Sequence, residues 1–131
     1  MKVVILAGGL GTRISEYTKF LPKPMIKVLG KPILIRIIDH FVKYGHKDFI
    51  IATGYKSKII ENYFKSKKNK KYKVDLINTG KNTMTGGRLK RLKKYLNETF
   101  LMTYGDGLSS VNIDKLIKFH KKNKKLVTLT A

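Results

Sequence analysis

Residues 2–13 read KVVILAGGLGTR, an apolar run that ends in a cluster of glycines. The short stretch 2–7, in which aliphatic residues follow Lys2 without a break, is typical of a strand that is buried on both faces of a parallel sheet. The glycines that follow predict a loop whose backbone can approach a ligand closely and whose successive N–H groups can surround an anion. The opening stretch therefore favours an α/β protein whose first strand ends in a ligand-binding loop.

The rest of the chain alternates strand-like and helix-like segments. Further strands are expected at residues 48–53, 73–78, 99–104 and 126–130. Helices are expected at residues 32–42, 58–64, about 86–96 and 114–122. Asn112 is suited to cap the last of these helices. This alternation predicts a three-layer, Rossmann-like fold, in which a mostly parallel sheet carries helices on both faces.

Length and composition narrow the class of protein. The 131 residues suit one domain, 1–131, and the absence of cysteine excludes a disulfide scaffold, a thiolate metal site and a cysteine nucleophile. The apolar start breaks at Gly8, which is too early for a signal peptide or a membrane span. We therefore expect a cytoplasmic protein without a membrane partner.

The chain is strongly basic, with 29 Lys and Arg against 8 Asp and Glu and a net charge of +21. Such a charge raises nucleic acid or phosphate-bearing ligands as partners. The excess is almost entirely lysine and is dispersed, including a like-charged stretch at 65–71 that predicts a solvated loop. A dedicated DNA-binding protein more often uses arginine. The pattern favours a solvated surface and disfavours nucleic acid as the main partner.

Ligands of parallel α/β sheets bind outside the carboxyl ends of the strands. The first such loop does not match two familiar motifs, because Ile14 replaces the third glycine of the dinucleotide fingerprint and no Gly-Lys-Ser/Thr follows. Arg13 places a cation beside the glycines, which suits a polyphosphate. The alternative is a tight strand–helix turn without a ligand.

Two further charged residues occupy restrained positions. Lys23 lies between Pro22 and Pro24, which stiffen the backbone on both sides. Asp106 follows the strand expected at 99–104 and has a glycine on each side, where its carboxylate suits Mg²⁺ bound to a triphosphate. The alternatives are one more lysine in a lysine-rich chain and an aspartate chosen for its turn.

A second glycine pair opens the helix expected at about 86–96. Gly86 and Gly87 would leave free N–H groups for a phosphate or a base edge. Arg88 then lies in the first helical turn, where a cation is unfavourable unless an anion binds nearby. The basic residues after it, Arg91 among them, also suit an ordinary solvated helix face.

Together these motifs resemble those of the sugar-phosphate nucleotidyltransferases. The shared motifs are LAGGLGTR at 6–13, PKPM at 22–25, TMTGGRLKR at 83–91 and TYGDG at 103–107. The last two resemble the glucose-1-phosphate cytidylyltransferase branch. The resemblance covers essentially the whole chain and implies the nucleotide-diphospho-sugar transferase fold. It also implies that the domain is incomplete at its C-terminus, because family members are longer.

The resemblance implies a reaction in which CTP and glucose 1-phosphate yield CDP-glucose and pyrophosphate, with Mg²⁺ as cofactor. It assigns catalytic roles to Arg13 on the phosphates, to Lys23 at the α-phosphate and to Asp106 as the metal ligand. The implied nucleotide-binding residues are Leu6, Ala7, Gly8, Gly9, Leu10, Gly11, Thr12, Arg13, Lys23, Thr83, Arg88 and Gly105. In the family such products serve surface-polysaccharide biosynthesis, including O-antigen.

Two alternatives stay open at this point. One is a nucleotide-binding remnant without turnover, since the sugar-binding residues and the second metal-ligating aspartate of the family lie in the part that this chain lacks. The other is a sugar-1-phosphate nucleotidyltransferase that uses dTTP, UTP or GTP. The chain is also shorter than the family between Phe64 and Thr79, which leaves open whether it forms a homo-oligomer.

Overall fold

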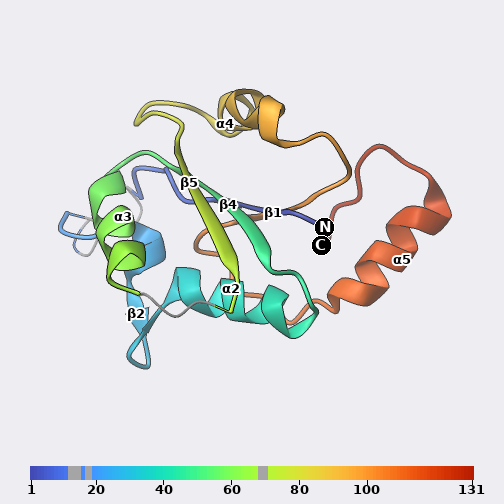
Figure 1. Ribbon diagram of the computed structural model, residues 1–131, viewed down its shortest axis with the longest axis horizontal. Coiled ribbons are helices and arrows are strands. Elements are labelled where there is room, and N and C mark those ends of the chain that lie inside the picture. The colour runs from blue at the N-terminus through green and yellow to red at the C-terminus, as the bar shows by residue number, and fades with distance from the viewer. Residues whose placement is uncertain (12–15, 17–18, 68–70) are drawn as a thin grey trace.

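The fold is built on a four-stranded, all-parallel sheet, as Figure 1 shows. The computed structural model describes residues 1–11, 16, 19–67 and 71–131. The strands are β1 (Val3–Leu6), β4 (Asp48–Thr53), β5 (Lys73–Asn78) and β6 (Leu101–Tyr104), in the order β5-β4-β1-β6. The first four predicted strands are confirmed, although the fourth begins at Leu101 instead of residue 99.

Helices cover both faces of the sheet, which confirms the three-layer prediction. On one face Val3 and Ile5 of β1 share a core with α2 (Ile33–Lys43) and α3 (Ser57–Ser66). On the other face Val4 and Leu6 share a core with Leu92 of α4 (Thr85–Leu92). Figure 1 shows α4 and α2 on opposite sides of the strands. Because β1 is buried from both sides, its sequence is continuously apolar.

The order of the strands reverses at β1. The chain runs from β1 through α2 to β4 and through α3 to β5, and then returns through α4 to β6 on the other side of β1. Right-handed crossovers in opposite directions place their helices on opposite faces of a sheet. A reversal of this kind opens a crevice at the carboxyl ends of the strands, where α/β proteins bind their ligands.

The helix and loop boundaries differ slightly from those predicted. Helix α2 begins one residue after Pro32, and α3 extends to Ser66, so the predicted loop at 65–71 begins within a helix. The helix expected at about 86–96 is α4 followed by a 3-10 turn, η3 (Lys93–Tyr95). Among the described residues, no helix combines the length and apolar character needed to cross a membrane.

The proline-rich segment forms small elements that the sequence analysis did not predict. Around Lys23 the chain makes a single 3-10 turn, η2 (Lys23–Met25). A two-stranded antiparallel hairpin follows, made of β2 (Lys27–Val28) and β3 (Lys31–Pro32). Its turn has positive φ at Leu29 (49°) and Gly30 (73°), the backbone of a type I′ hairpin turn.

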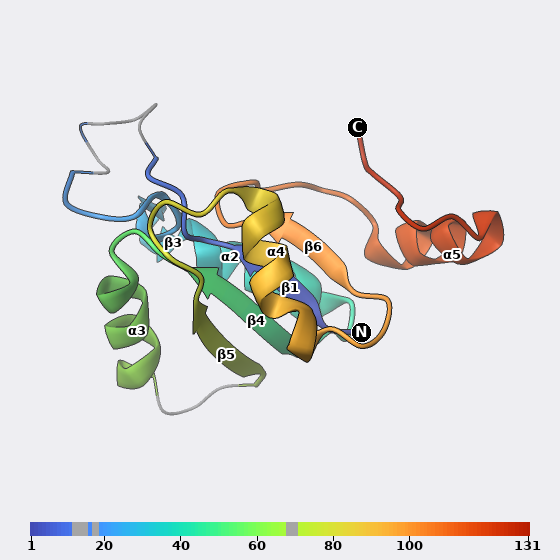
Figure 2. The ribbon, with the colours of Figure 1, turned by 90° about the horizontal axis from the view of Figure 1, so that it is seen from above.

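The last helix is as predicted, but the last strand is not. Helix α5 (Ile113–Asn123) is capped by Asn112, whose side-chain oxygen accepts the Lys115 N–H at 3.0 Å. The strand prediction for 126–130 is wrong, because these residues pair with no strand among those the structure describes. Instead the segment lies against α5, where the Thr128 hydroxyl is 2.9 Å from His120 Nδ1. Figure 2 shows α5 and this tail beyond β6, at one end of the molecule.

Candidate functional site

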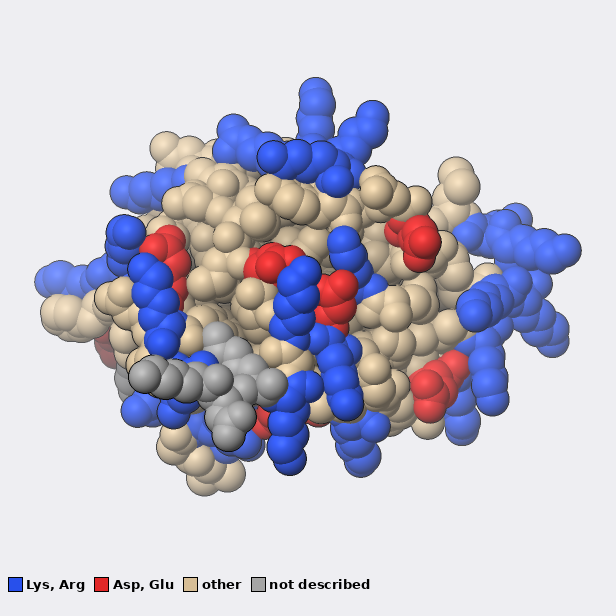
Figure 3. Space-filling view, viewed as in Figure 1, with Lys and Arg blue, Asp and Glu red and all other residues tan. Residues whose placement is uncertain are grey.

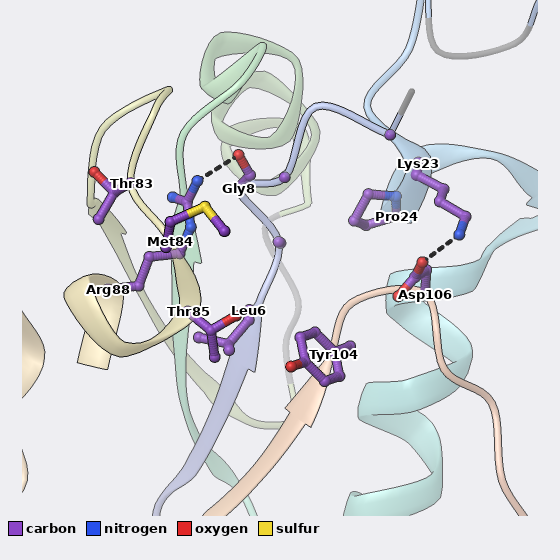
Figure 4. A pocket seen from close by; sticks show the side chains of 13 residues that line it. Leu6, Gly8, Lys23, Pro24, Thr83, Met84, Thr85, Arg88, Tyr104 and Asp106 are labelled. Carbon is purple, nitrogen blue, oxygen red and sulfur yellow. Dashed lines mark hydrogen bonds and ion pairs between the residues drawn. The ribbon is translucent and has the colours of Figure 1, made fainter. Parts of the chain in front are cut away.

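A cavity of about 310 Å³ lies at the carboxyl edge of the sheet, where β1 and β6 end (Figure 4). Nine of the residues predicted for the site line it: Leu6, Ala7, Gly8, Gly9, Gly11, Lys23, Thr83, Arg88 and Asp106. Four lining residues were not among those predictions: Pro24, Met84, Thr85 and Tyr104. All four lie in or beside the motifs already quoted, so position within those motifs was the available signal.

Four predicted site residues need separate mention. Leu10 does not line the cavity and is 41% exposed. Gly105 lies just behind the cavity wall and donates its N–H to the Leu6 carbonyl at 2.9 Å. A Cβ at Gly105 would lie 2.9 Å from Pro24 Cγ, so glycine permits this close packing. Thr12 and Arg13 lie outside the described residues.

The start of the glycine loop is held in place by hydrogen bonds to the neighbouring strand and loop. Ala7 donates its N–H to the Ala52 carbonyl at 2.9 Å, which continues the pairing of β1 with β4. The Gly8 carbonyl accepts from the Tyr55 N–H at 3.2 Å and from Arg88 Nη2 at 2.7 Å. The loop therefore leaves the sheet in a defined direction beside the cavity.

Arg88 is a buried cation beside the cavity, with 4% of its surface exposed. Its Nη1 donates to the Thr79 hydroxyl at 2.6 Å, the Gly80 carbonyl at 2.9 Å and the Thr53 carbonyl at 3.2 Å. These acceptors are neutral, and among the described residues no carboxylate forms an ion pair with Arg88. Burial, with Arg91 nearby, lowers the pKa of Arg88 from its ordinary value, but a guanidinium stays protonated in proteins. The uncompensated charge favours an anion in the cavity.

Glycines allow three strand-end loops to meet around this guanidinium. A Cβ at Gly54, just after β4, would lie 2.5 Å from the Gly80 carbonyl oxygen and 2.9 Å from that of Gly8. Gly80, after β5, has a φ of +91°, which side chains rarely adopt. The sequence analysis missed both residues. Their position directly after predicted strands was the signal that could have identified them.

On the opposite side of the cavity, Lys23 and Asp106 form an ion pair. Lys23 Nζ lies 2.5 Å from Asp106 Oδ2, and the two side chains are 28% and 32% exposed. Lys23 comes from η2 and Asp106 from the turn after β6, so the fold joins residues 83 positions apart. Figure 4 shows this pair facing Arg88 and Thr83 across the cavity.

Among the described residues that line the cavity, Asp106 supplies the carboxylate that a metal could use. Among the described residues, no group of three or more His, Asp or Glu side chains is arranged to hold a metal ion. Mg²⁺ commonly uses one or two carboxylates, with substrate phosphates and water completing its shell. Asp106 therefore fits a magnesium ion that arrives with a phosphate-bearing ligand, and does not by itself form a closed metal site.

Thr83, Met84 and Thr85 line the cavity from the loop and first turn of α4. The Thr83 hydroxyl accepts a hydrogen bond from Arg91 Nη1 at 2.7 Å. The N-terminus of α4 adds unpaired backbone N–H groups and the positive end of the helix dipole. This side of the cavity can donate hydrogen bonds to an anionic or oxygen-rich ligand.

The fold and the site together define a class of protein. A parallel α/β sheet carries at its carboxyl edge a glycine loop, a buried guanidinium and a lysine beside a carboxylate. Such a site is suited to a ligand that bears phosphate groups. On the face that Figure 3 shows, lysine and arginine side chains project from several separate places.

The chain belongs to the nucleotidyl transferase family, whose model matches residues 2–131. It is 45% identical to glucose-1-phosphate cytidylyltransferase of Salmonella typhimurium, over all of this chain and 60% of that protein. It is 38% identical to a probable glucose-1-phosphate cytidylyltransferase of Bacillus subtilis, with the same shares covered. The chain thus spans about 60% of the length of these curated relatives. The predicted family is confirmed.

Solved structures agree with this fold. HddC from Yersinia pseudotuberculosis, complexed with GMP-PN, is 34% identical and superposes with a TM-score of 0.79, over 91% of this chain and 53% of that one. A UDP-glucose pyrophosphorylase complexed with UDP-glucose has a TM-score of 0.76 at 20% identity, over 94% of this chain and 54% of that one. At that identity the second likeness shows the fold alone.

Proposed function

We propose that this chain is the nucleotide-binding part of a glucose-1-phosphate cytidylyltransferase, which converts CTP and glucose 1-phosphate into CDP-glucose and pyrophosphate. The observation that carries the proposal is the convergence of the glycine loop, Arg88 and the Lys23–Asp106 pair on one cavity. The cytidylyltransferase relatives, which match the whole chain at 45% and 38% identity, support the choice of base and sugar.

In the proposed reaction, a phosphate oxygen of glucose 1-phosphate attacks the α-phosphorus of CTP. A new P–O bond forms there, the bond between the α-phosphorus and the bridging oxygen breaks, and pyrophosphate leaves with that oxygen. The protein has little covalent work to do, because positioning and charge neutralisation account for most of catalysis in phosphoryl transfer.

Each side of the cavity has a part in this chemistry. The glycine loop, residues 6–13, receives the nucleotide phosphates, and Arg13 is proposed to contact them. Arg88 supplies a fixed positive field from beneath the loop. Lys23 is proposed to leave Asp106 and stabilise the charge that develops around the α-phosphate. Thr83 and Arg88 are proposed to contact the cytidine nucleotide, and Gly105 is proposed to line the site, where it packs closely against Pro24.

Asp106 is the residue proposed to hold Mg²⁺, with nucleotide phosphates as the other ligands. When bound, the ion neutralises phosphate charge and orients the triphosphate. A partner for Asp106 is already present, since the Lys23 ammonium lies 2.5 Å from its carboxylate. When the ligand binds, Asp106 would contact the cation and Lys23 would contact a phosphate. Two favourable contacts then replace the one ion pair.

The test is calorimetric titration of the chain with CTP and Mg²⁺, with UTP, dTTP and GTP as comparison nucleotides. We expect CTP to bind with the highest affinity. Lys23→Ala and Asp106→Ala should each weaken CTP binding by about tenfold or more, because each removes a charge-assisted contact. Lys31→Ala is the matched control, since Lys31 forms an exposed 2.9 Å ion pair with Asp39 outside the cavity.

Two results would contradict the proposal. Equal affinity for all four nucleotides would contradict the proposed preference for CTP. Unchanged CTP binding in both cavity variants would show that the nucleotide does not bind in this cavity. Turnover is followed separately, as pyrophosphate released from CTP and glucose 1-phosphate. Selective CTP binding without pyrophosphate release would identify the alternative, a nucleotide-binding unit that does not complete the reaction alone.

A further inference from the structure

Arg91 holds a residue of the cavity wall without lining the cavity itself. It lies three positions after Arg88 on α4, and its Nη1 donates to the Thr79 carbonyl and, at 2.7 Å, to the Thr83 hydroxyl oxygen. Thr83 lines the cavity, whereas Arg91 does not. The guanidinium therefore ties the side chain of Thr83 to the backbone at the end of β5.

The local backbone is shaped around this contact. A Cβ at Gly80 would lie 2.6 Å from Arg91 Nη1 and 2.7 Å from the Thr83 hydroxyl oxygen, so a side chain there would separate the two. Thr79 connects the two arginines of α4, since its hydroxyl accepts from Arg88 and its carbonyl accepts from Arg91. The loop between β5 and α4 is thus fixed from both ends.

The direction of the Thr83 hydroxyl follows from its partner. Arginine has no acceptor, so in this contact Thr83 Oγ1 accepts and the guanidinium donates. The hydroxyl hydrogen then cannot point at Arg91 and is left to be donated elsewhere. Because Thr83 lies on the cavity wall, that hydrogen is available to an acceptor of a bound ligand.

We propose that Arg91 is a positioning residue for base selection: it presents the Thr83 hydroxyl as a hydrogen-bond donor to the base of the nucleotide. This inference rests on the proposed function. Cytosine has an acceptor at ring position N3, whereas uracil and thymine carry N3–H and guanine carries N1–H on the corresponding edge. Arg91 occupies one acceptor site of the Thr83 oxygen and leaves its hydrogen free to be donated. A base with an acceptor at this position takes that hydrogen, whereas a base with a donor there leaves it without this partner and is bound less tightly.

The experiment measures dissociation constants for CTP and UTP, each with Mg²⁺, and follows their ratio. Arg91→Met removes the guanidinium, and Thr83→Val removes the hydroxyl at nearly constant shape. Each should reduce the preference for CTP over UTP by about threefold to tenfold, the equivalent of one hydrogen bond. In the double variant the reduction should be no larger than in Thr83→Val alone, because both substitutions remove the same interaction.

Lys90→Met is the matched control. It removes one positive charge from the neighbouring, exposed position of α4, and it should leave the CTP-to-UTP ratio unchanged. The unfolding midpoint of each variant is measured alongside. If Arg91→Met does not fold, Arg91→Lys takes its place, since it retains the charge but not the planar guanidinium. A reduced ratio in that variant is then expected.

The inference and the proposed function fail in different ways. If the unchanged chain prefers CTP and Arg91→Met weakens CTP and UTP equally, Arg91 acts on general binding and the inference is overturned. Additive losses in the double variant would overturn it as well. If the unchanged chain does not prefer CTP, the proposed function itself is contradicted, and the assignment of Thr83 is contradicted with it.

Discussion

The cavity has two cationic sides that differ in almost every physical respect. Arg88 is 4% exposed and is surrounded by neutral oxygens from the end of β4 and from the loops after β1 and β5. Lys23 lies across the cavity with its side chain 28% exposed, and its partner is the charged carboxylate of Asp106. One cation is enclosed by the fold, and the other is held by an ion pair that can be exchanged for a ligand contact.

This difference indicates a division of labour. Removing this buried cation takes one donor from each of several carbonyls. The Gly8 and Thr53 carbonyls keep other donors, from Tyr55 and Thr79, whereas a buried polar group left unsatisfied costs about 1–3 kcal/mol. A partly exposed ion pair contributes about 0–1 kcal/mol to folding and can change partners. We therefore expect the Arg88 side to determine the stability of the site and the Lys23 side to respond to ligand. The following predictions test this division, from the largest effect to the smallest.

Arg88→Met should lower the free energy of unfolding by about 2–4 kcal/mol, because the Gly8, Thr53 and Gly80 carbonyls lose a donor. The measurement is urea unfolding followed by circular dichroism. Arg36→Met is the control, since Arg36 donates to the Val28 and Leu29 carbonyls at the exposed hairpin. Equal losses of unfolding free energy in the two variants would show that the buried Arg88 stabilises the fold no more than the exposed Arg36 does.

Gly54→Ala should cost about 1–3 kcal/mol, because the added Cβ meets the Gly80 carbonyl oxygen at 2.5 Å and backbone must move. Thermal unfolding of the purified variant reports this loss. The control is Gly86→Ala on α4, where a Cβ meets nothing within 4 Å. Alanine there should be neutral or stabilise by up to about 1 kcal/mol through its helix propensity. A neutral Gly54→Ala would show that the three loops do not meet as tightly as described.

Lys23→Met and Asp106→Asn should each change the free energy of unfolding by less than about 1 kcal/mol, since the pair is partly exposed. Both should nevertheless reduce the rise in melting temperature that CTP and Mg²⁺ produce in the unchanged chain. Differential scanning fluorimetry with and without nucleotide measures both quantities. A large loss of stability without nucleotide would contradict the contrast with Arg88.

The smallest effect is expected at the opposite edge of the sheet, away from both cations. Burial, together with the charged N-terminus 3.5 Å away, lowers the pKa of His46 from its ordinary value of 6.5. The native state therefore binds a proton less readily than the unfolded state does. This contribution to stability is present above pH 6.5 and is lost as the pH falls below it.

His46→Gln should reduce the fall in unfolding free energy between pH 7 and the acid range, as measured by urea titration at several pH values. Lys23→Met, at the carboxyl edge, is the control. It should show the same fall in unfolding free energy as the unchanged chain, because it leaves His46 and Met1 in place. If the free energy of unfolding falls equally at low pH in His46→Gln and in the unchanged chain, groups other than His46 cause that fall.

Local sequence was sufficient for most elements of the fold. The strand-like segments at 48–53 and 73–78 coincide with β4 and β5, because each is long enough to pair with a neighbour and is bounded by loop-forming residues. The run at 126–130 has the same local character, but it lies against α5 and pairs with no described strand. A strand needs a hydrogen-bonded partner, and partners are not encoded in the segment itself.

The sequence by itself determined the order of strands and helices and the three-layer class, since these follow from apolar periodicity and glycine position. Most residues of the cavity wall were predicted through the resemblance of the motifs to those of the family. Only the tertiary structure decided how the charges are used. It buried Arg88 among carbonyls, brought Lys23 to Asp106, and tied Arg91 to Thr83. The physical reason is that burial and pairing depend on residues distant in the chain, which a parallel sheet brings to one edge.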